Sequence, residues 1–176
     1  MMGNYERINS GYIGEAWDHL TGIPSTYYSM SDASTINNNA ASFWQIVNDA
    51  MYKNLVAALS TDADNPFNLV PSHAYSVLGT YNYTDDNGNY RYLVKIRNPW
   101  GEDHYNSSLV WGDNDTATWT LNAKNMLPYV NDLEDGVFFM EASDCILGYN
   151  GLWIGHFYDT FVNNYLEVRG AANNTL

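Results

Sequence analysis

The sequence predicts an α+β fold, in which one main helix precedes a set of antiparallel strands. The segment ASFWQIVNDAMYKN carries apolar residues at helical spacing, and the segments after it are rich in Tyr and Val and joined by turn residues. A helix followed by a run of strands is typical of this fold class. With 176 residues, 45% of them apolar, the chain is long enough to form one domain with a buried core.

The main helix is predicted from about residue 42 to residue 53. Its apolar stripe is expected to face the core and consists of Phe43, Ile46, Val47, Ala50 and Met51. Ser42, with Gln45 three residues later, has the pattern of a capping box, which would start the helix at this serine. The preceding segment, 21–39, is dominated by Gly, Pro, Ser and Asn, so we expect it to be a loop.

The strands are predicted from short segments whose residues suit a pleated sheet. In chain order these segments are 55–60, 73–83, 90–97, 137–140 and 152–158. Asp86, Asn87 and Gly88 separate the second strand from the third and tolerate the positive φ angles of a hairpin turn. We also expect a short helix within 122–130, a helical turn near 143–149, and a tail over 161–176.

The composition excludes several classes of function. The 20 acidic residues against 7 Lys and Arg give a formal charge of −13, which repels phosphate backbones and anionic membranes, so nucleic-acid binding is not expected. No apolar segment approaches the ~18 residues needed to cross a bilayer, and the first residues lack the pattern of a signal peptide. The single cysteine, Cys145, leaves no internal disulfide framework. These features predict an intracellular, cytoplasmic protein.

Two polar residues stand at opposite ends of the predicted hairpin. His73 begins its first strand, and Asn98 follows its second strand within the sequence RNPWG. Because the open ends of paired antiparallel strands lie side by side, the two side chains are expected within reach of each other. In a thiol protease an imidazole takes and returns a proton, while an amide oxygen fixes the ring orientation. The indole of Trp100 could cover such a pair.

The same residues also allow a structural interpretation. A single histidine on a strand is usually a partly buried polar residue, and Asn-Pro is a common turn sequence. Catalysis would further require a nucleophile, which the pair does not contain. The residue types alone therefore leave both interpretations open.

The motifs HAYSV and RNPWG, joined by a hairpin at this spacing, closely resemble the calpain family of calcium-dependent cysteine proteases. Other segments match the family in the same order: INSGYIGEAWDHLTGIPS, SFWQIVNDAM, LVAALS, WGDNDTATW and LEDGVFFMEASDCI. The resemblance covers about residues 5–160. It implies the second, β-rich lobe of a papain-like protease core, with an antiparallel, barrel-like sheet and one main helix.

The resemblance also implies catalytic roles. His73 would be the general base and acid, Asn98 its orienting partner, and Trp100 the cover over both. In the family, the nucleophilic Cys and the Gln of the oxyanion hole belong to a separate first lobe that precedes these motifs. Cys145 stands where the family has an aromatic residue, and we expect it to pack in the core. Ser72, before the histidine, replaces a usual Gly.

A Ca²⁺ site in this lobe is a further implication of the resemblance. The candidate ligands are Asp113, Asp135, the backbone oxygen of Leu133, and Glu102. Two positions depart from the family pattern, because His104 and Val137 stand where Glu is expected. Ca²⁺ takes about six to eight oxygens, so Asp103 and Asp115 are additional candidates to complete a partly degenerate site.

Two functional hypotheses follow. In the first, the chain is the His/Asn half of a calpain-type cysteine endopeptidase, inactive alone because its nucleophile lies elsewhere in the precursor or on another polypeptide. In the second, it is a non-catalytic, calpain-like module in a larger intracellular assembly, for example a cytoskeletal one. The retained HAYSV and RNPWG motifs favour the first, whereas the absent Cys lobe and the altered calcium ligands favour the second. Under both, we expect the missing lobe or another protein to cover the surface at Trp100.

Overall fold

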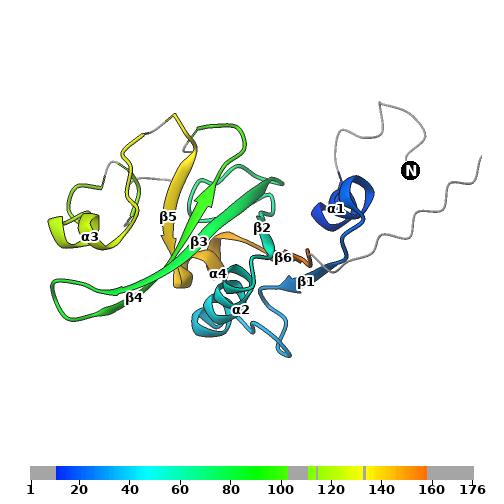
Figure 1. The fold of residues 1–176 in the computed structure, drawn as a ribbon, viewed down its shortest axis with the longest axis horizontal. Helices are drawn as coiled ribbons and strands as arrows, with labels where there is room; N and C mark the ends of the chain where they lie inside the picture. Colours follow the sequence, from blue (N-terminus) through cyan, green and yellow to red (C-terminus); the bar gives the residue numbers. More distant parts are fainter. Residues whose placement is uncertain (1–10, 103–110, 114, 133, 158–176) are drawn as a thin grey trace, which may run out of the picture.

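The structure is a computed structural model, and it describes residues 11–102, 111–113, 115–132 and 134–157. Its centre is a six-stranded antiparallel sheet with the strand order β1-β6-β2-β3-β4-β5 (Figure 1). The strands are β1 (Ser25–Ser29), β2 (Val56–Ser60), β3 (Ala74–Thr84), β4 (Tyr90–Arg97), β5 (Val137–Glu141) and β6 (Gly151–Gly155). The predicted α+β class is confirmed, but the described strands form an open sheet with edges β1 and β5, not a closed barrel.

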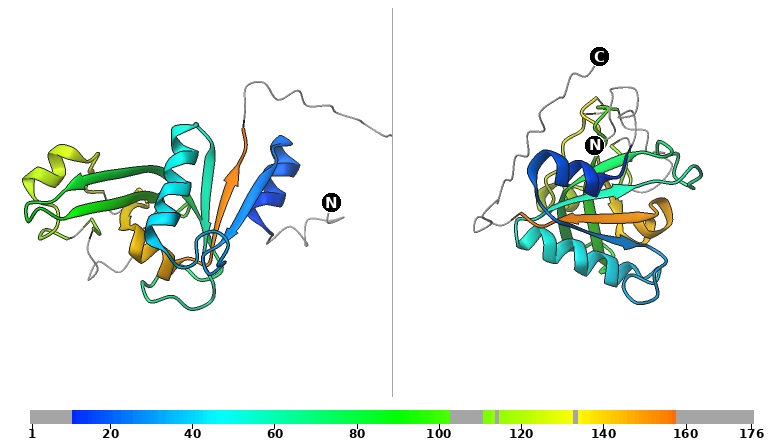
Figure 2. Two further views of the ribbon diagram at one scale, coloured as in Figure 1. Left: turned by 90° about the horizontal axis from the view of Figure 1, so that it is seen from below. Right: turned by 90° about the vertical axis from the view of Figure 1, so that its right-hand side faces the viewer.

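The helices of the described residues lie on both faces of this sheet. They are α1 (Ile13–Thr21), α2 (Ala40–Tyr52), α3 (Leu121–Met126) and α4 (Ala142–Gly148). Helices α2 and α4 pack together on one face, whereas α1 crosses β1 and β6 on the other (Figure 2). Trp153 shows this change of side, because its ring lies against Gly14 of α1 while its neighbours Leu152 and Ile154 point into the main core. No helix in the described part of the chain is long and apolar enough to span a membrane.

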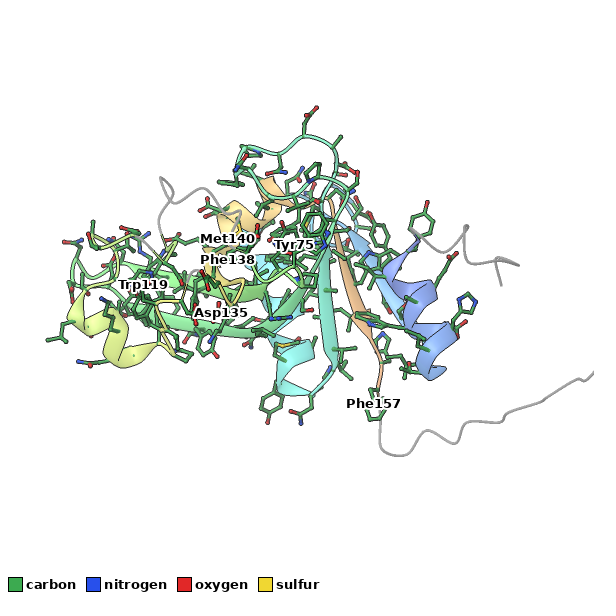
Figure 3. All side chains as sticks on the ribbon, turned by 90° about the horizontal axis from the view of Figure 1, so that it is seen from above. Tyr75, Trp119, Asp135, Phe138, Met140 and Phe157 are labelled. Atoms are coloured by element: carbon green, nitrogen blue, oxygen red, sulfur yellow. The ribbon has the colours of Figure 1, made fainter. Side chains whose placement is uncertain are left out.

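Two apolar clusters hold the sheet. The main cluster joins α2 and α4 to the middle strands, and Tyr75, Phe138 and Met140 lie together within it (Figure 3). The second cluster lies at the far end of the β3–β4 hairpin, near α3, where Figure 3 shows Trp119. Consecutive residues of β5 are divided between the clusters, since Phe138 belongs to the main one and Phe139 to the second. The β5 segment is therefore buried on both sides.

The predicted elements agree with most of the observed ones, with two corrections. Helix α2 is capped by Asn39, whose side-chain oxygen accepts the N–H of Ser42 at 3.0 Å. The predicted capping box is wrong, because Gln45 instead donates to Asp49 within the helix. The segment 21–39 is not wholly a loop, since it contains β1, which is held by pairing with the distant strand β6.

The β3–β4 hairpin carries the candidate site at its open end. Its strands pair from Ser76 opposite Arg97 to Thr84 opposite Tyr90, with a bulge between Val77 and Gly79. The predicted turn is confirmed by Gly88, which has a φ of 83°. Its N–H donates to the carbonyl of Asp85 at 2.9 Å. Because the turn sets the register, it also sets which residues meet at the open end.

Close packing of two chain segments fixes the end of β4 against the start of β5. The N–H of Asn98 donates to the carbonyl of Gly136 at 2.8 Å. Gly136 has a φ of 71°, and a Cβ atom there would lie 2.5 Å from the carbonyl oxygen of Asn98. Only glycine therefore fits this approach without movement of the main chain.

We predict that Gly136→Ala lowers the free energy of unfolding by about 2–3 kcal/mol, because it adds a main-chain clash to the strain of a left-handed residue. The matched control is Gly88→Ala, where φ is also positive (83°) but no atom lies within 4 Å of the added methyl. The control should cost only about 1 kcal/mol. Urea denaturation of both variants measures the difference, and equal losses would contradict the proposed clash.

Candidate active site

His73 and Asn98 meet at the open end of the hairpin, one just before β3 and the other just after β4. Continuing the β3–β4 register by one pair beyond Ser76 and Arg97 places Asn98 opposite Tyr75. His73 precedes Tyr75 by two residues, so it is the diagonal neighbour of Asn98 on the same face of the sheet. The Nε2 atom of His73 lies 2.9 Å from the Oδ1 atom of Asn98. The contact predicted from the sequence is therefore present.

Asn98 is fully buried, and each of its polar groups has a partner. Its main-chain N–H donates to Gly136, and its carbonyl accepts the N–H of Gly101 at 3.1 Å. In the side chain, Oδ1 accepts the N–H of Trp100 at 3.1 Å, and Nδ2 donates to the carbonyl of Glu102 at 2.8 Å. The two side-chain bonds orient the amide, the two main-chain bonds anchor the residue, and water does not reach it.

This network determines which nitrogen of His73 carries the proton. A main-chain N–H can only donate and a carbonyl can only accept, so Trp100 and Glu102 allow one orientation of the Asn98 amide. That orientation presents an acceptor, Oδ1, to the imidazole. The neutral ring must therefore be protonated at Nε2, which leaves the lone pair on Nδ1 for a second proton.

Aromatic rings contact the imidazole on two sides. The Trp100 ring lies 4.4 Å from the His73 ring, centroid to centroid, at an angle of 50°. The Tyr75 ring lies at 5.1 Å with its plane turned by 86°. Trp100 nevertheless remains 64% exposed, so it covers the histidine with part of its surface and presents the rest outward.

A hollow of about 450 Å³ opens beside His73. Its aromatic wall includes Tyr12, Tyr27 and Trp153, and Asp62 is also part of its lining. The Tyr27 and Trp153 rings lie 4.7 Å apart. The arrangement can accept a side chain next to the imidazole, which is a requirement for chemistry on a bound peptide.

Cys145 is not part of this site. It lies in α4 with no exposed surface and belongs to the main apolar cluster, as its predicted packing role requires. Burial, together with the charge of Asp144, raises the pKa of its thiol well above the usual value. A buried, protonated thiol is a poor nucleophile, so the chain's one cysteine does not complete a triad with His73.

Three of the candidate calcium ligands, Asp113, Asp135 and Asp115, accept main-chain N–H groups in the described structure. Asp113 is 5% exposed, and its Oδ2 atom accepts the N–H of Asp132 at 3.0 Å. The carboxylate of Asp135 accepts the N–H of Val137 at 2.6 Å. Asp115 accepts main-chain N–H groups of its own turn, which Trp111, Ala117 and Thr118 supply.

The other candidate ligands are only partly described. Leu133, Asp103 and His104 lie outside the described residues. Glu102 is described, and its carbonyl accepts the amide of Asn98. Among the described residues, no group of three or more His, Cys, Asp or Glu is arranged to hold a metal ion. The calcium site therefore stays a prediction.

Asp113 is nevertheless electrostatically unusual. Burial, and after it the charges of Asp135 and Asp132, raises the pKa of its carboxyl from 3.8 to about 6. The folded protein therefore holds this proton more tightly than the unfolded chain does. The contribution of Asp113 to stability is most favourable below about pH 4 and is lost as the pH rises through about 6.

We predict that Asp113→Asn stabilises the protein near pH 7 by about 2 kcal/mol and has little effect near pH 4, because the amide keeps an acceptor without the charge. Thermal melts across this pH range measure the effect. The exposed Asp86→Asn serves as the control and should change neither curve. A variant that is less stable than the wild type near pH 7 would show that something neutralises Asp113.

The same melts with calcium chloride test the expected cation. Ca²⁺ at Asp113 would stabilise the wild type near pH 7 by mass action and leave Asp113→Asn unchanged. Equal shifts in both proteins would contradict a site at this carboxylate.

Two features of the site were not predicted from the sequence. The carbonyl of Glu102 holds the Asn98 amide, and Gly136 allows the close approach that anchors the main chain of Asn98. The Asp-Gly pair at 135–136 is a signal for a turn, but it does not reveal which segment lies against the glycine.

Comparisons with known proteins agree with the geometry. A profile described as calpain family cysteine protease matches residues 1–156. The human calpain-2 catalytic subunit is 28% identical over 160 residues, which cover 86% of this chain and 22% of that protein. Human calpain-14 is 27% identical over 147 residues, or 82% of this chain and 20% of that protein. The chain thus spans about a fifth of the length of these relatives.

Among solved structures, the SERA5 proenzyme from Plasmodium falciparum aligns with a TM-score of 0.42 and 16% identity, covering 75% of this chain and 31% of that one. This likeness is too low to carry an argument. The profile match, in contrast, extends over most of the sequence and includes both His73 and Asn98. The chain belongs to the calpain family of cysteine proteases.

Proposed function

We propose that this chain is the His/Asn-bearing lobe of a calpain-type cysteine endopeptidase, which acts on protein substrates once a second, Cys-bearing lobe is present. The observation that carries the proposal is the 2.9 Å contact between His73 Nε2 and Asn98 Oδ1, made by an amide whose orientation is fixed. A structural histidine does not require such an arrangement. The family membership of the chain supports the same conclusion.

The proposed chemistry uses the free nitrogen of His73. The thiol of the second lobe gives its proton to Nδ1, and the resulting imidazolium keeps its Nε2 proton on the Asn98 oxygen. The thiolate attacks the peptide carbonyl, and His73 then returns the Nδ1 proton to the leaving amine. Asn98 holds the ring in place without adding a charge of its own.

The proposal also requires a surface that binds the Cys-bearing lobe. Apolar side chains are exposed along the sheet near the site, with Val56 at 42%, Leu78 at 46% and Trp100 at 64%. Val56, Leu78 and Pro99 line a separate hollow of about 700 Å³. Monomeric proteins seldom leave such surface bare, so we assign it to the missing lobe.

The remaining expectations from the sequence stay predictions. These are a calcium requirement, which the Asp113 melting curves test, and a cytoplasmic location. A non-catalytic module in a larger assembly is the alternative outcome of the activity test.

We predict that the chain alone does not hydrolyse a fluorogenic peptide at millimolar calcium, because its single cysteine is buried and the resemblance assigns the oxyanion donor to the other lobe. Addition of the Cys-bearing lobe of a calpain as a separate polypeptide should produce hydrolysis, and His73→Ala should reduce it to background. His156→Ala, which removes a histidine bonded to Thr26 at 2.7 Å, is the control and should keep the activity.

Two results would argue against the proposal. Hydrolysis by the isolated chain that disappears in His73→Ala would reveal an unrecognised nucleophile. A stable complex of the two lobes that never hydrolyses peptide would favour the non-catalytic module.

We predict that Trp100→Ala weakens association with the Cys-bearing lobe by about 2 kcal/mol or more, as for aromatic anchors at other interfaces. Leu121→Ala is the control, because Leu121 is 77% exposed in α3, which lies at the far end of the hairpin. Isothermal titration calorimetry measures both. An unchanged affinity of Trp100→Ala for the Cys-bearing lobe would mean that the two lobes associate through another surface.

A further inference from the structure

Thr61 lies opposite His73 at the end of the β2–β3 ladder. The described pairing ends with Ser60 opposite Ala74, so Thr61 and His73 form the next pair outward. The main-chain N–H of Thr61 donates to the carbonyl of His73 at 3.0 Å, as in a regular antiparallel pair. In the other direction, however, the N–H of His73 donates to the side-chain Oγ1 of Thr61, also at 3.0 Å. A hydroxyl thus takes the position that a main-chain carbonyl has in a regular ladder.

The same hydroxyl also holds the chain that leads into His73. Thr61 is only 4% exposed, and its Oγ1 donates to the carbonyl of Val70 at 2.6 Å. The N–H of Val70 in turn donates to the hydroxyl of Tyr75 at 2.8 Å. Both main-chain groups of Val70 are therefore held, and the end of the loop 62–71 is tied to the start of β3.

The backbone just before His73 depends on such support. Ser72 has a φ of 50°, in the left-handed region that is unfavourable for a residue with a side chain. Its N–H donates to the carbonyl of Asp62 at 3.3 Å. Residues in this conformation persist only where the surrounding structure holds them. Thr61 and Asp62 are adjacent, and together they hold the turn from which the imidazole projects.

We propose that Thr61 is a positioning residue for His73, in which the hydroxyl sets the main-chain position from which Nε2 reaches Asn98. The loss of this hydroxyl would leave the N–H of His73 and the carbonyl of Val70 without their partner. The catalytic meaning of this inference rests on the proposed function. The contact itself can be measured without catalysis.

The test compares Thr61→Val, which has the same shape without the hydroxyl, with Thr61→Ser, which keeps it. The control is Thr80→Val, which removes a comparable 2.8 Å bond from a β3 threonine to Asn48, away from His73. The measured quantity is the rate at which the Nε2 proton of His73 exchanges with water, followed by nuclear magnetic resonance. Asn98→Ala identifies the signal by abolishing its hydrogen bond.

The exchange rate should rise at least about tenfold in Thr61→Val and change little in Thr61→Ser or Thr80→Val. A wild-type rate in Thr61→Val, or an equal rise in Thr80→Val, would overturn the proposal. If Thr61→Val does not fold, the proposal is tested by the rate at which the main-chain amide proton of His73 exchanges with water in the wild type. This amide should be protected like that of Tyr75, and exchange as fast as that of Ala63 in the exposed loop would overturn the proposal.

These outcomes are separate from those of the activity test. Normal protection of the His73 contact in a complex that does not hydrolyse peptide would count against the proposed function and leave the role of Thr61 intact. If the complex is active and the protection of the His73 contact does not depend on Thr61, the proposed function stands and the role of Thr61 is contradicted.

Discussion

The buried amide of Asn98 is the constraint on which the site depends. The main-chain and side-chain hydrogen bonds of Asn98 join the end of β4, the turn after it and the start of β5. Because a buried polar group left without a partner costs free energy, the amide can be accommodated only if these segments keep their relative positions. The residue that orients the imidazole is thus also the one that fixes the surrounding chain.

The two faces of the sheet are covered by different parts of the chain. The main cluster, with α2 and α4, covers one face of the middle strands, while α1 and the α3 cluster cover the two ends of the other. At the far end of the hairpin, Arg91 bonds to both Asp85 and Glu141 at 2.9 Å, and Glu141 also accepts the indole N–H of Trp111. These bonds stabilise the long hairpin from the end opposite to His73, so its open end can be left for function.

The parts of the structure that follow from local patterns were predictable. The apolar spacing in 42–53 predicts α2, and the hairpin turn at 86–88 predicts that His73 and Asn98 meet, because a turn determines the register of its strands. Features that depend on distant contacts were not predictable in this way. Strand β1 exists through its pairing with β6. Gly136 matters only because Asn98 lies against it.

Trp100 has two surfaces, one against the imidazole and one facing outward. Any molecule that binds the outward surface with the ring in its present position favours the conformation in which His73 contacts Asn98. Thermodynamic reciprocity then requires the converse, so that whatever tightens the His73–Asn98 contact raises the affinity for that molecule by the same factor. Through this one ring, the recognition of a partner and the orientation of the base become coupled parts of a single equilibrium.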